Sequence, residues 1–249
     1  MVDEMSVAGT EQSWDETLGW RPTAHQLEQF QALYAQILQG NQQLNLTRIT
    51  EAQAFEEKHL WDSLAGILPW LVGTAPMPVP ERCRVIDIGS GGGFPGLPVA
   101  IARPQWHISL LDATRKKMAF LETVAQTLGL ANVGVICDRA ESLGQDPDHR
   151  QQYDLALIRA VGPASVCAEY ALPFLQVEGH AVLYRGQWSD QEAEGLSAAL
   201  EVLGGEIVAT RRCLLPVSDG VRHYICLQKQ QETPPQFPRR VGLPTKRPL

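Results

Sequence analysis

The chain has 249 residues, 44% of them hydrophobic, and a formal net charge of −7 at pH 7. These values favour one large α/β domain with additions over two independent domains, and they argue against a generally basic nucleic-acid-binding protein. No apolar run reaches the roughly 18 residues needed to cross a bilayer, and the acidic N-terminus is unlike a secretory leader, so we expect a cytoplasmic chain without a membrane partner.

The first 80 residues predict a lead-in followed by helices. Residues 1–20 lack periodicity and carry five acids and no Lys or Arg, so we expect a mobile lead-in over 1–22. Two capping boxes predict the starts of two helices, and Gly40 is the expected end of the first helix. The boxes are Thr23 with Gln26 and Thr50 with Gln53, and the second helix extends through Lys58 and His59. A Pro/Gly-rich stretch at 69–80 completes a helical cap and linker over 23–80.

Residues 81–230 alternate short β-rich runs with helical patterns, which indicates a mostly parallel sheet covered on both faces. The expected strands are 84–88, 107–112, 133–137, 153–158, 180–184, 206–212 and 222–228. The expected helices follow Gly96 and cover 114–128, 164–176 and 189–203. The last two strands are joined by a turn at 218–220 and should form an antiparallel hairpin at one edge. Residues 231–249 are expected to form a basic C-terminal tail.

The cysteines give no sign of a metal site. There are five of them, they are scattered, and no C-x-x-C pair occurs. We therefore expect buried thiols in a reducing compartment and no bound metal.

A glycine-rich turn directly follows the first expected strand. Residues 87–96 read DIGSGGGFPG, which places Asp87, Gly89 and Gly91 at the carboxyl end of the strand, where open α/β sheets bind ligands. The stretch also fits the dinucleotide pattern G-x-G-x-x-G counted from Gly91. Asp87 would repel a pyrophosphate but suit a cationic ligand, so we favour a sulfonium nucleoside with an amino-acid end over a dinucleotide.

Acidic residues also follow the next two expected strands. Asp112 is placed to accept hydrogen bonds from the ribose hydroxyls of an adenosine, as either ligand would require. Asp138, Ala140 and Glu141 follow the third strand, where side chain and backbone could hold an adenine ring. Each acid alone would more often be a solvated loop residue, and it is the ordered set at consecutive strand ends that favours S-adenosylmethionine as the cofactor.

With these motifs in view, the sequence resembles the RsmG (GidB) family of bacterial methyltransferases, which modify N7 of a guanosine in small-subunit ribosomal RNA. The resemblance spans roughly residues 23–249. It rests on NLT at 45–47, KHLWDSL at 58–64, VIDIGSGGGFPGLPVA at 85–100, LLDATRKKMAFL at 110–121, DRAES at 138–142, IRAVG at 158–162 and the tail PRRVGLPTKRPL. It implies a class I, Rossmann-like methyltransferase fold with a seven-stranded sheet and an N-terminal helical cap.

The resemblance also implies roles for particular residues. Gly89 and Phe94 would line the cofactor pocket, with Asp112, Ala113 and Thr114 around the ribose. Ala140 and Glu141 would flank the adenine, and Arg159 would face the methyl-donor end. The family commonly has Ser-Arg-Ala at this last point, whereas Ile158 precedes Arg159 here.

Attack by guanine N7 needs no general base, because its lone pair is not protonated at neutral pH, so catalysis can consist of positioning. We expect Arg159, His59 and Asp62 at the catalytic centre, with Ser63 near the substrate mouth. His59 could instead be a polar residue packed at the domain junction, and Arg159 a surface ion-pair partner. N7 faces the narrow major groove of A-form RNA, so the target guanine should be in a loop or extruded from a helix.

Basic residues mark candidate contacts to RNA phosphates, although a solvated tail or helix face would explain them equally well. The candidates are Arg48, Lys58, Arg239, Arg240, Lys246 and Arg247, with Arg115, Lys116 and Lys117 as further ones. The expected partner is small-subunit ribosomal RNA or the assembling small subunit, bound by a monomer. A methyltransferase acting on a small molecule or protein, and a non-catalytic protein that binds S-adenosylmethionine or RNA, remain alternatives.

Overall fold

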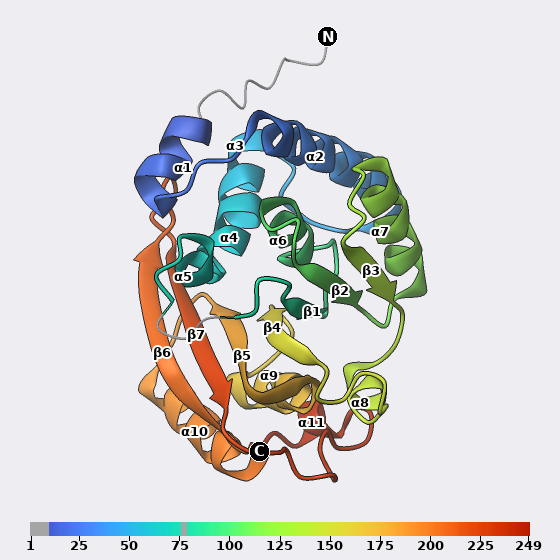
Figure 1. Cartoon of the computed structure of the whole chain (residues 1–249), viewed down its shortest axis with the longest axis vertical. Coiled ribbons are helices and arrows are strands. Elements are labelled where there is room, and N and C mark those ends of the chain that lie inside the picture. Colours follow the sequence, from blue (N-terminus) through green and yellow to red (C-terminus); the bar gives the residue numbers. More distant parts are fainter. Residues whose placement is uncertain (1–9, 76–78) are drawn as a thin grey trace.

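The computed structural model describes residues 10–75 and 79–249, and it contains one seven-stranded sheet with helices on both faces (Figure 1). The strand order is β3-β2-β1-β4-β5-β7-β6. The strands are β1 (Arg84–Ile88), β2 (His107–Leu111), β3 (Val133–Ile136), β4 (Tyr153–Arg159), β5 (Leu175–Arg185), β6 (Gly205–Leu214) and β7 (Val221–Lys229). The first five run parallel, whereas β7 pairs antiparallel with both β5 and β6. The expected fold class and edge hairpin are confirmed.

Strand β1 shows how the sheet is buried on both faces. Val85 belongs to one apolar core, and its neighbours Ile86 and Ile88 belong to another. The first core lies toward the N-terminal helices, α6 (Gly96–Ala102) and α7 (Arg115–Thr127), and the second lies toward α9 (Ala164–Ala171) and α10 (Asp190–Leu203). Alternate residues of a strand point to opposite faces, so a strand covered on both sides is apolar throughout.

The N-terminal helices form the expected cap, with three differences from the sequence prediction. They are α1 (Thr10–Leu18), α2 (Ala24–Leu44), α3 (Ala52–Phe55), η2 (Glu56–Trp61), α4 (Asp62–Gly66) and α5 (Leu68–Leu71). The Thr23 capping box is present, but α2 continues past Gly40 to Leu44. A Cβ at Gly40 would lie 2.3 Å from the Phe120 ring, so this glycine allows α2 to approach α7 closely and does not end the helix. Glu51, not Thr50, caps α3.

The prediction of a mobile lead-in over 1–22 is wrong for helix α1. Trp14 and Leu18 lie four residues apart, one turn of helix, and both are buried in the first core. Trp14 packs against Phe30 of α2 with 5.2 Å between ring centroids. Two apolar residues are too few to produce a visible periodic pattern, which is why the sequence did not reveal this helix. Residues 1–9 lie outside the described residues.

The C-terminal residues pack against the core. Phe237 is 5% exposed in the second core, and Leu249 packs against the same cluster. The Arg150 guanidinium donates to the backbone carbonyls of Thr233 (2.7 Å) and Phe237 (2.7 Å). The segment ends in a short helix, α11 (Leu243–Lys246), which lies near α9 and α8 (Ala140–Leu143) in Figure 1. The basic tail is therefore part of the folded body.

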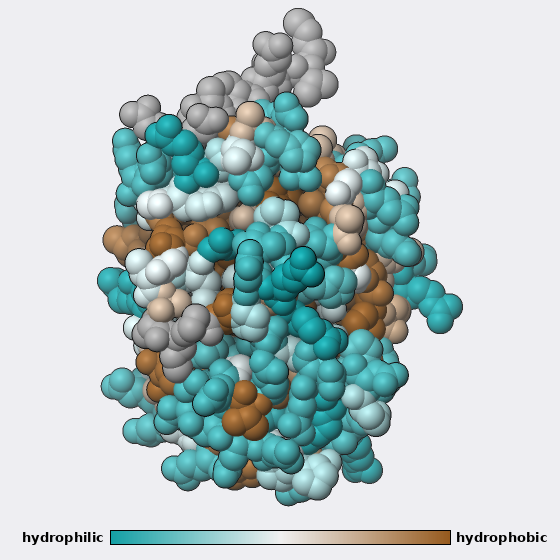
Figure 2. All heavy atoms as spheres, in the orientation of Figure 1, coloured by the Kyte–Doolittle hydropathy of each residue, from teal (hydrophilic) through white to brown (hydrophobic). Residues whose placement is uncertain are grey.

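The surface on the side shown in Figure 2 is mainly hydrophilic, with hydrophobic side chains visible in separate areas between the elements. Among the described residues, no helix is both long and apolar enough to span a membrane.

Candidate functional site

The glycine-rich turn joins β1 to α6 and leaves backbone groups open at the carboxyl edge of the sheet. Gly89 and Gly91 have φ values of 74° and 57°, which glycine adopts without strain. A Cβ at Gly89 would lie 2.6 Å from Val161 Cγ2, so only glycine lets the turn pass this side chain. The Gly91 N–H donates to Asp112 Oδ2 over 3.1 Å, which joins the turn to the end of β2.

Asp87 is fully buried beneath this turn. Its Oδ2 accepts a 2.9 Å hydrogen bond from the Gly96 N–H, but its Oδ1 has no hydrogen-bond partner among residues 10–75 and 79–249. Burial raises the pKa of the Asp87 carboxyl to about 7, although the Gly96 hydrogen bond opposes the shift. A buried carboxylate oxygen with no partner is costly unless a donor or a cation meets it. Asp87 therefore fits a cationic ligand better than a phosphate.

A hollow of about 320 Å³ lies at the carboxyl ends of β1, β2 and β3, and we call it the acidic hollow. It is lined by Ile88, Gly89, Leu111, Asp112, Ala113, Thr114, Asp138, Arg139, Ala140, Glu141, Val161, Tyr170 and Thr245. Asp112 Oδ1 accepts a 2.8 Å hydrogen bond from the Thr114 N–H, and this bond fixes the carboxylate at the rim. The hollow has the size and the acidic rim that a nucleoside with ribose hydroxyls requires.

Six of the ten predicted cofactor residues line the acidic hollow, but Asp87, Gly91, Phe94 and Arg159 do not. Asp87 is buried beneath the glycine-rich turn, and Gly91 is joined to the hollow through its hydrogen bond to Asp112. The Phe94 ring stacks on the His59 imidazole with 4.3 Å between centroids. The Arg159 guanidinium lies 5.6 Å from the Phe94 ring centroid. These two side chains thus belong to the neighbouring part of the site.

A second hollow, of about 590 Å³, lies beside the cap, and we call it the basic hollow. It is lined by Ile49, Lys58, His59, Asp62, Arg159, Ala160, Tyr184, Arg185, Gly186, Gln187, Glu192 and Arg222. Four of these residues are cations, and they come from η2, β4, β5 and β7. Such a lining suits an anionic, hydrogen-bonding ligand, such as a nucleotide of RNA.

Arg159 lies at the centre of the contacts around the basic hollow. Its Nη1 donates to the Lys58 carbonyl oxygen (3.0 Å) and to Asp62 Oδ2 (3.3 Å). Its side chain is 16% exposed, against 4% for Asp62, so the pair is largely shielded from water. The alternative of a surface ion pair therefore does not describe Arg159. The next residue, Ala160, has a φ of 57°, which is uncommon for a residue with a Cβ.

Asp62 collects several donors from distant parts of the chain. Its Oδ1 accepts hydrogen bonds from the Tyr224 hydroxyl (2.7 Å) and lies 3.3 Å from Arg222 Nε. With Arg159 on Oδ2, both carboxylate oxygens are paired. The buried Asp62 carboxylate thus joins the cap to β4 through Arg159 and to β7 through Arg222 and Tyr224.

His59 is neutral and held from both sides of its ring. Nδ1 lies 3.3 Å from Arg159 Nη2, and because arginine can only donate, Nδ1 must be the acceptor. The ring proton is then on Nε2, which donates to Thr47 Oγ1 over 2.7 Å. Burial and, after it, the Arg159 charge lower the pKa of His59 to about 3. His59 is buried at the junction of cap and core, and it also lines the basic hollow. Its position therefore agrees with both interpretations, a residue near the substrate and a polar residue packed at the junction.

Ser63 lies away from the basic hollow, contrary to the sequence expectation. It is fully buried, and its hydroxyl donates to the His59 carbonyl. Ser63 therefore stabilises the helical turn that carries His59.

The candidate RNA-binding residues fall into two groups. Arg48, Arg240, Lys246 and Arg247 are exposed, and Lys58 is half-buried at the basic hollow. Arg239 is different, because its Nε and Nη2 bind the carboxylate of Glu169, which is fully buried. A guanidinium held in this way is a structural tie and is not available to a phosphate.

Sequence reasoning missed several residues of the site. Arg185, Arg222 and Tyr224 lie on β5 and β7, and their strands gave no motif. Thr245 and Tyr170 line the acidic hollow from the C-terminal segment and α9. No sequence signal could have found them, because the pairing of β5 with β7 that brings them together exists only in the folded sheet.

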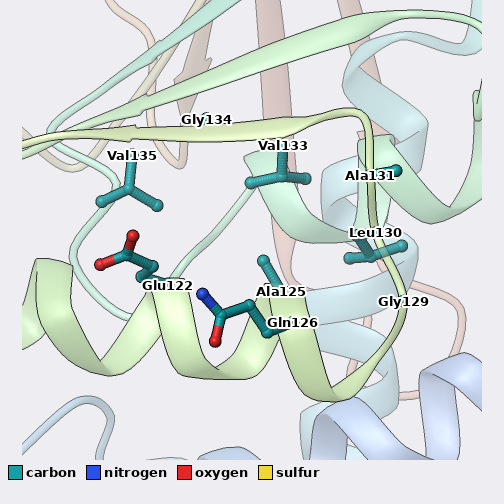
Figure 3. A pocket seen from close by; sticks show the side chains of 9 residues that line it. All are labelled: Glu122, Ala125, Gln126, Gly129, Leu130, Ala131, Val133, Gly134 and Val135. Carbon is teal, nitrogen blue, oxygen red and sulfur yellow. The ribbon is translucent and has the colours of Figure 1, made fainter.

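A third hollow, of about 420 Å³, lies between α7 and the edge strand β3 (Figure 3). Glu122, Ala125 and Gln126 face it from α7, and Val133 and Val135 face it from β3. It has one acid, no cation and no link to the glycine turn, so it is not the functional site. Among the described residues, no group of His, Cys, Asp or Glu could hold a metal ion, and the five cysteines are free thiols.

Comparison with known proteins gives close relatives. The family model for rRNA small subunit methyltransferase G matches residues 26–219. The Ribosomal RNA small subunit methyltransferase G of Synechococcus elongatus is 55% identical over 95% of this chain and 96% of the relative. The protein of the same name from Nostoc punctiforme is 53% identical, again over 95% and 96%.

Solved structures of lower identity share the fold. M. jannaschii TYW2 in complex with AdoMet is 15% identical with a TM-score of 0.53, over 74% of this chain and 79% of that chain. The 16S rRNA (adenine(1408)-N(1))-methyltransferase from Catenulisporales acidiphilia is 14% identical with a TM-score of 0.51, over 61% and 87%. At these identities the likeness concerns the fold alone.

Proposed function

Because the chain belongs to the rRNA small subunit methyltransferase G family, we propose that it transfers the methyl group of S-adenosylmethionine to N7 of a guanosine in small-subunit ribosomal RNA. One observation carries the proposal. Val161 lines the acidic hollow, whereas Arg159 and Ala160, just before it, line the basic hollow. The end of β4 is therefore a wall of both hollows, so the hollows are adjacent. A methyl donor and its acceptor have to be bound next to each other in this way.

The residues of the acidic hollow fit the cofactor. Asp112 offers its carboxylate to the ribose hydroxyls, and Ala140 and Glu141 border the place for the adenine. Asp87 does not line the hollow, but it is buried beneath the adjoining glycine-rich turn, where a negative charge would suit the cationic sulfonium. When bound, S-adenosylmethionine supplies a methyl group activated by a sulfonium centre.

The residues of the basic hollow fit an extruded nucleotide. Lys58 and Arg222 can meet phosphates, whereas the Arg185 guanidinium is held by Glu192, and the hollow is large enough for a base. A guanine paired within A-form RNA would hide its N7 in a deep, narrow groove, so the enzyme has to receive the base outside the helix.

The chain acts on this substrate by positioning it. N7 carries a free lone pair at neutral pH, so no residue has to take up a proton before the attack. His59, with a pKa of about 3, could not hold a proton at neutral pH. Arg159 is fixed by Lys58 and Asp62, so its direction does not change when the substrate arrives. Holding the reactants in line in this way can contribute on the order of 7–11 kcal/mol to lowering the barrier.

We propose a cytoplasmic monomer that acts on ribosomal RNA or on the assembling small subunit. Residues 23–80 act as the cap, 81–230 as the catalytic core, and the exposed cations of 231–249, with Arg48 and Lys58, as the phosphate contacts. Each basic contact to a phosphate should add to the salt dependence of RNA binding.

Transfer of label tests the proposed function. Purified protein is incubated with methyl-labelled S-adenosylmethionine and either small subunits or their naked RNA, and the modified base is mapped. We expect label in a single guanine, at N7, shown by strand cleavage after reduction and aniline treatment. Label in a pyrimidine, in a ribose or only in protein would contradict the proposal, and the two substrates distinguish naked RNA from the assembled subunit.

A further inference from the structure

The C-terminal segment contributes a wall to the acidic hollow. Thr245, in α11, lines the hollow together with Asp112 and Glu141, although it lies far from both in the sequence. Thr245 is exposed, and its hydroxyl donates to the Gly242 carbonyl oxygen over 3.1 Å. In Figure 1, α11 lies beside α8 and α9 on the side where β4 ends.

Glu141 holds this segment in place. It is 3% exposed, and its Oε1 accepts hydrogen bonds from the Gly242 N–H (2.9 Å) and the Tyr170 hydroxyl (3.1 Å). Arg139 binds both carboxylate oxygens. Burial alone would raise the pKa of Glu141, but the hydrogen bonds from Arg139 and Gly242 outweigh it and keep the pKa below its usual value. The carboxylate is thus engaged with protein donors and cannot serve mainly as a ligand for an adenine.

A second tie fixes the segment before it reaches the hollow. Arg239 Nη2 lies 2.5 Å from Glu169 Oε2, and the Arg239 backbone N–H donates to Glu169 Oε1 over 2.8 Å. Glu169 and Tyr170 are neighbours on α9, so the two ties hold residues 239–242 along one helix. Two buried carboxylates fasten this stretch to the core, which is more than a solvated tail requires.

We propose that residues 239–247 are a cofactor-binding element, in which Thr245 closes the adenosine side of the acidic hollow and Glu141 is the positioning residue that holds Thr245 there. The inference rests on the proposed function and adds a binding role to a segment whose charge suggested only RNA contact. Arg240, Lys246 and Arg247 stay exposed on the same segment, and in the part of the chain that the structure describes they form no ion pair. RNA contact and cofactor contact therefore use different side chains of one segment.

Calorimetric titration with S-adenosylhomocysteine tests the inference without relying on activity. Thr245 is exposed, so Thr245→Tyr should fold normally while its larger side chain fills the hollow, and we expect the Kd to rise by about tenfold or more. Thr245→Ser is the matched control, because it keeps the hydroxyl and adds no bulk, and it should bind as the wild type does.

Two further variants separate cofactor contact from RNA contact. Glu141→Ala removes the acceptor that holds the Gly242 N–H, and we expect its Kd for S-adenosylhomocysteine to rise by about tenfold. The double variant Lys246→Ala with Arg247→Ala should keep the wild-type Kd and lose RNA affinity only. Glu141→Gln should weaken ligand binding less than Glu141→Ala, because the amide oxygen can still accept from Gly242.

The outcomes are distinguishable from failure of the proposed function. If the wild type binds S-adenosylhomocysteine but Thr245→Tyr and Glu141→Ala bind it equally well, the inference is overturned and the proposed function stands. If the wild type does not bind it, both fall together.

Discussion

The two hollows lie at one edge of the same sheet, yet they are built in different ways. The acidic hollow is formed mainly by the ends of three successive strands, with Gly89, Asp112 and Ala140 close behind them. The basic hollow brings together Lys58 from the cap, Arg159 from β4 and Arg222 from β7. A binding site for a common cofactor can therefore be encoded locally, whereas the substrate site depends on the completed fold.

The difference extends to chemistry. The acidic hollow presents backbone groups and fixed carboxylates to its ligand. Their negative charge suits a cationic ligand that has hydroxyl groups. In the basic hollow, cations are held by a buried carboxylate, as when Asp62 binds Arg159 and Arg222. Substitutions on one side should therefore change cofactor affinity, and those on the other side should change turnover.

The largest expected effect breaks the acidic hollow alone. Gly91→Asp places a carboxylate beside Asp112 and a Cβ at a φ of 57°, so we expect the Kd for S-adenosylhomocysteine to rise by at least about 100-fold. Gly91→Asn is the matched control, since it has the same shape without the charge, and it should lose much less affinity. Unchanged binding in the aspartate variant would show that the ligand does not approach this turn.

A change in the basic hollow should have the opposite signature. Arg159→Lys keeps the charge but loses the planar fork that contacts Lys58, Asp62 and His59, and we expect kcat to fall by about 30-fold. Affinity for S-adenosylhomocysteine, measured by calorimetry, should stay within a few-fold of the wild type. An equal loss of both quantities would place Arg159 on the cofactor side, as the family resemblance implied.

The two hollows also differ in how much of each could be predicted from the sequence. The strands, their order of appearance and the edge hairpin followed from alternating apolar runs, and the glycine turn with Asp87 and Asp112 followed from local spacing. Asp62 and Tyr224 are 162 residues apart in the sequence, and no local pattern announces their hydrogen bond. Their pairing is a consequence of tertiary packing.

Two other predictions failed for related reasons. Glycine was interpreted as a helix stop at Gly40, where it serves packing against Phe120. The charge of Arg239 was interpreted as an RNA contact, but its guanidinium forms an ion pair with the buried carboxylate of Glu169. A sequence shows the type of a residue but not its partners, and partners decide whether a charge is available.

A smaller effect, of pH on cofactor binding, would sharpen the assignment of Asp87. Burial raises the pKa of this carboxyl to about 7, so in the free protein it holds a proton below that pH. A cationic ligand favours the ionised form, and binding should then release a proton. We expect affinity for S-adenosylmethionine, which carries the sulfonium charge, to fall as pH drops below 7, by at most about tenfold per pH unit, and to level off above 7.

Calorimetry in buffers of different ionisation enthalpy measures the released proton directly. Asp87→Asn keeps the shape and should remove the pH dependence below 7. If the variant retains it, another group is responsible.

The smallest effect on turnover is expected for His59. His59→Gln can still contact Thr47, and because a histidine with a pKa of about 3 carries no proton in the reaction, kcat should stay within about threefold between pH 6 and 8. Stability should change with a definite sign. A depressed pKa in the folded state destabilises the wild type as pH falls from 6.5 toward 3, and the glutamine variant should lack this contribution in thermal unfolding. Loss of an ionisation from the kcat profile would instead make His59 a general base.

A crystal structure with both S-adenosylhomocysteine and guanosine 5′-monophosphate bound tests most directly whether the two hollows divide the reaction between them. We predict the adenosine in the acidic hollow against Asp112 and Thr245, and the guanine in the basic hollow beside Arg159 and Arg222. Adenosine in the basic hollow, or both ligands in the same hollow, would contradict the division of roles.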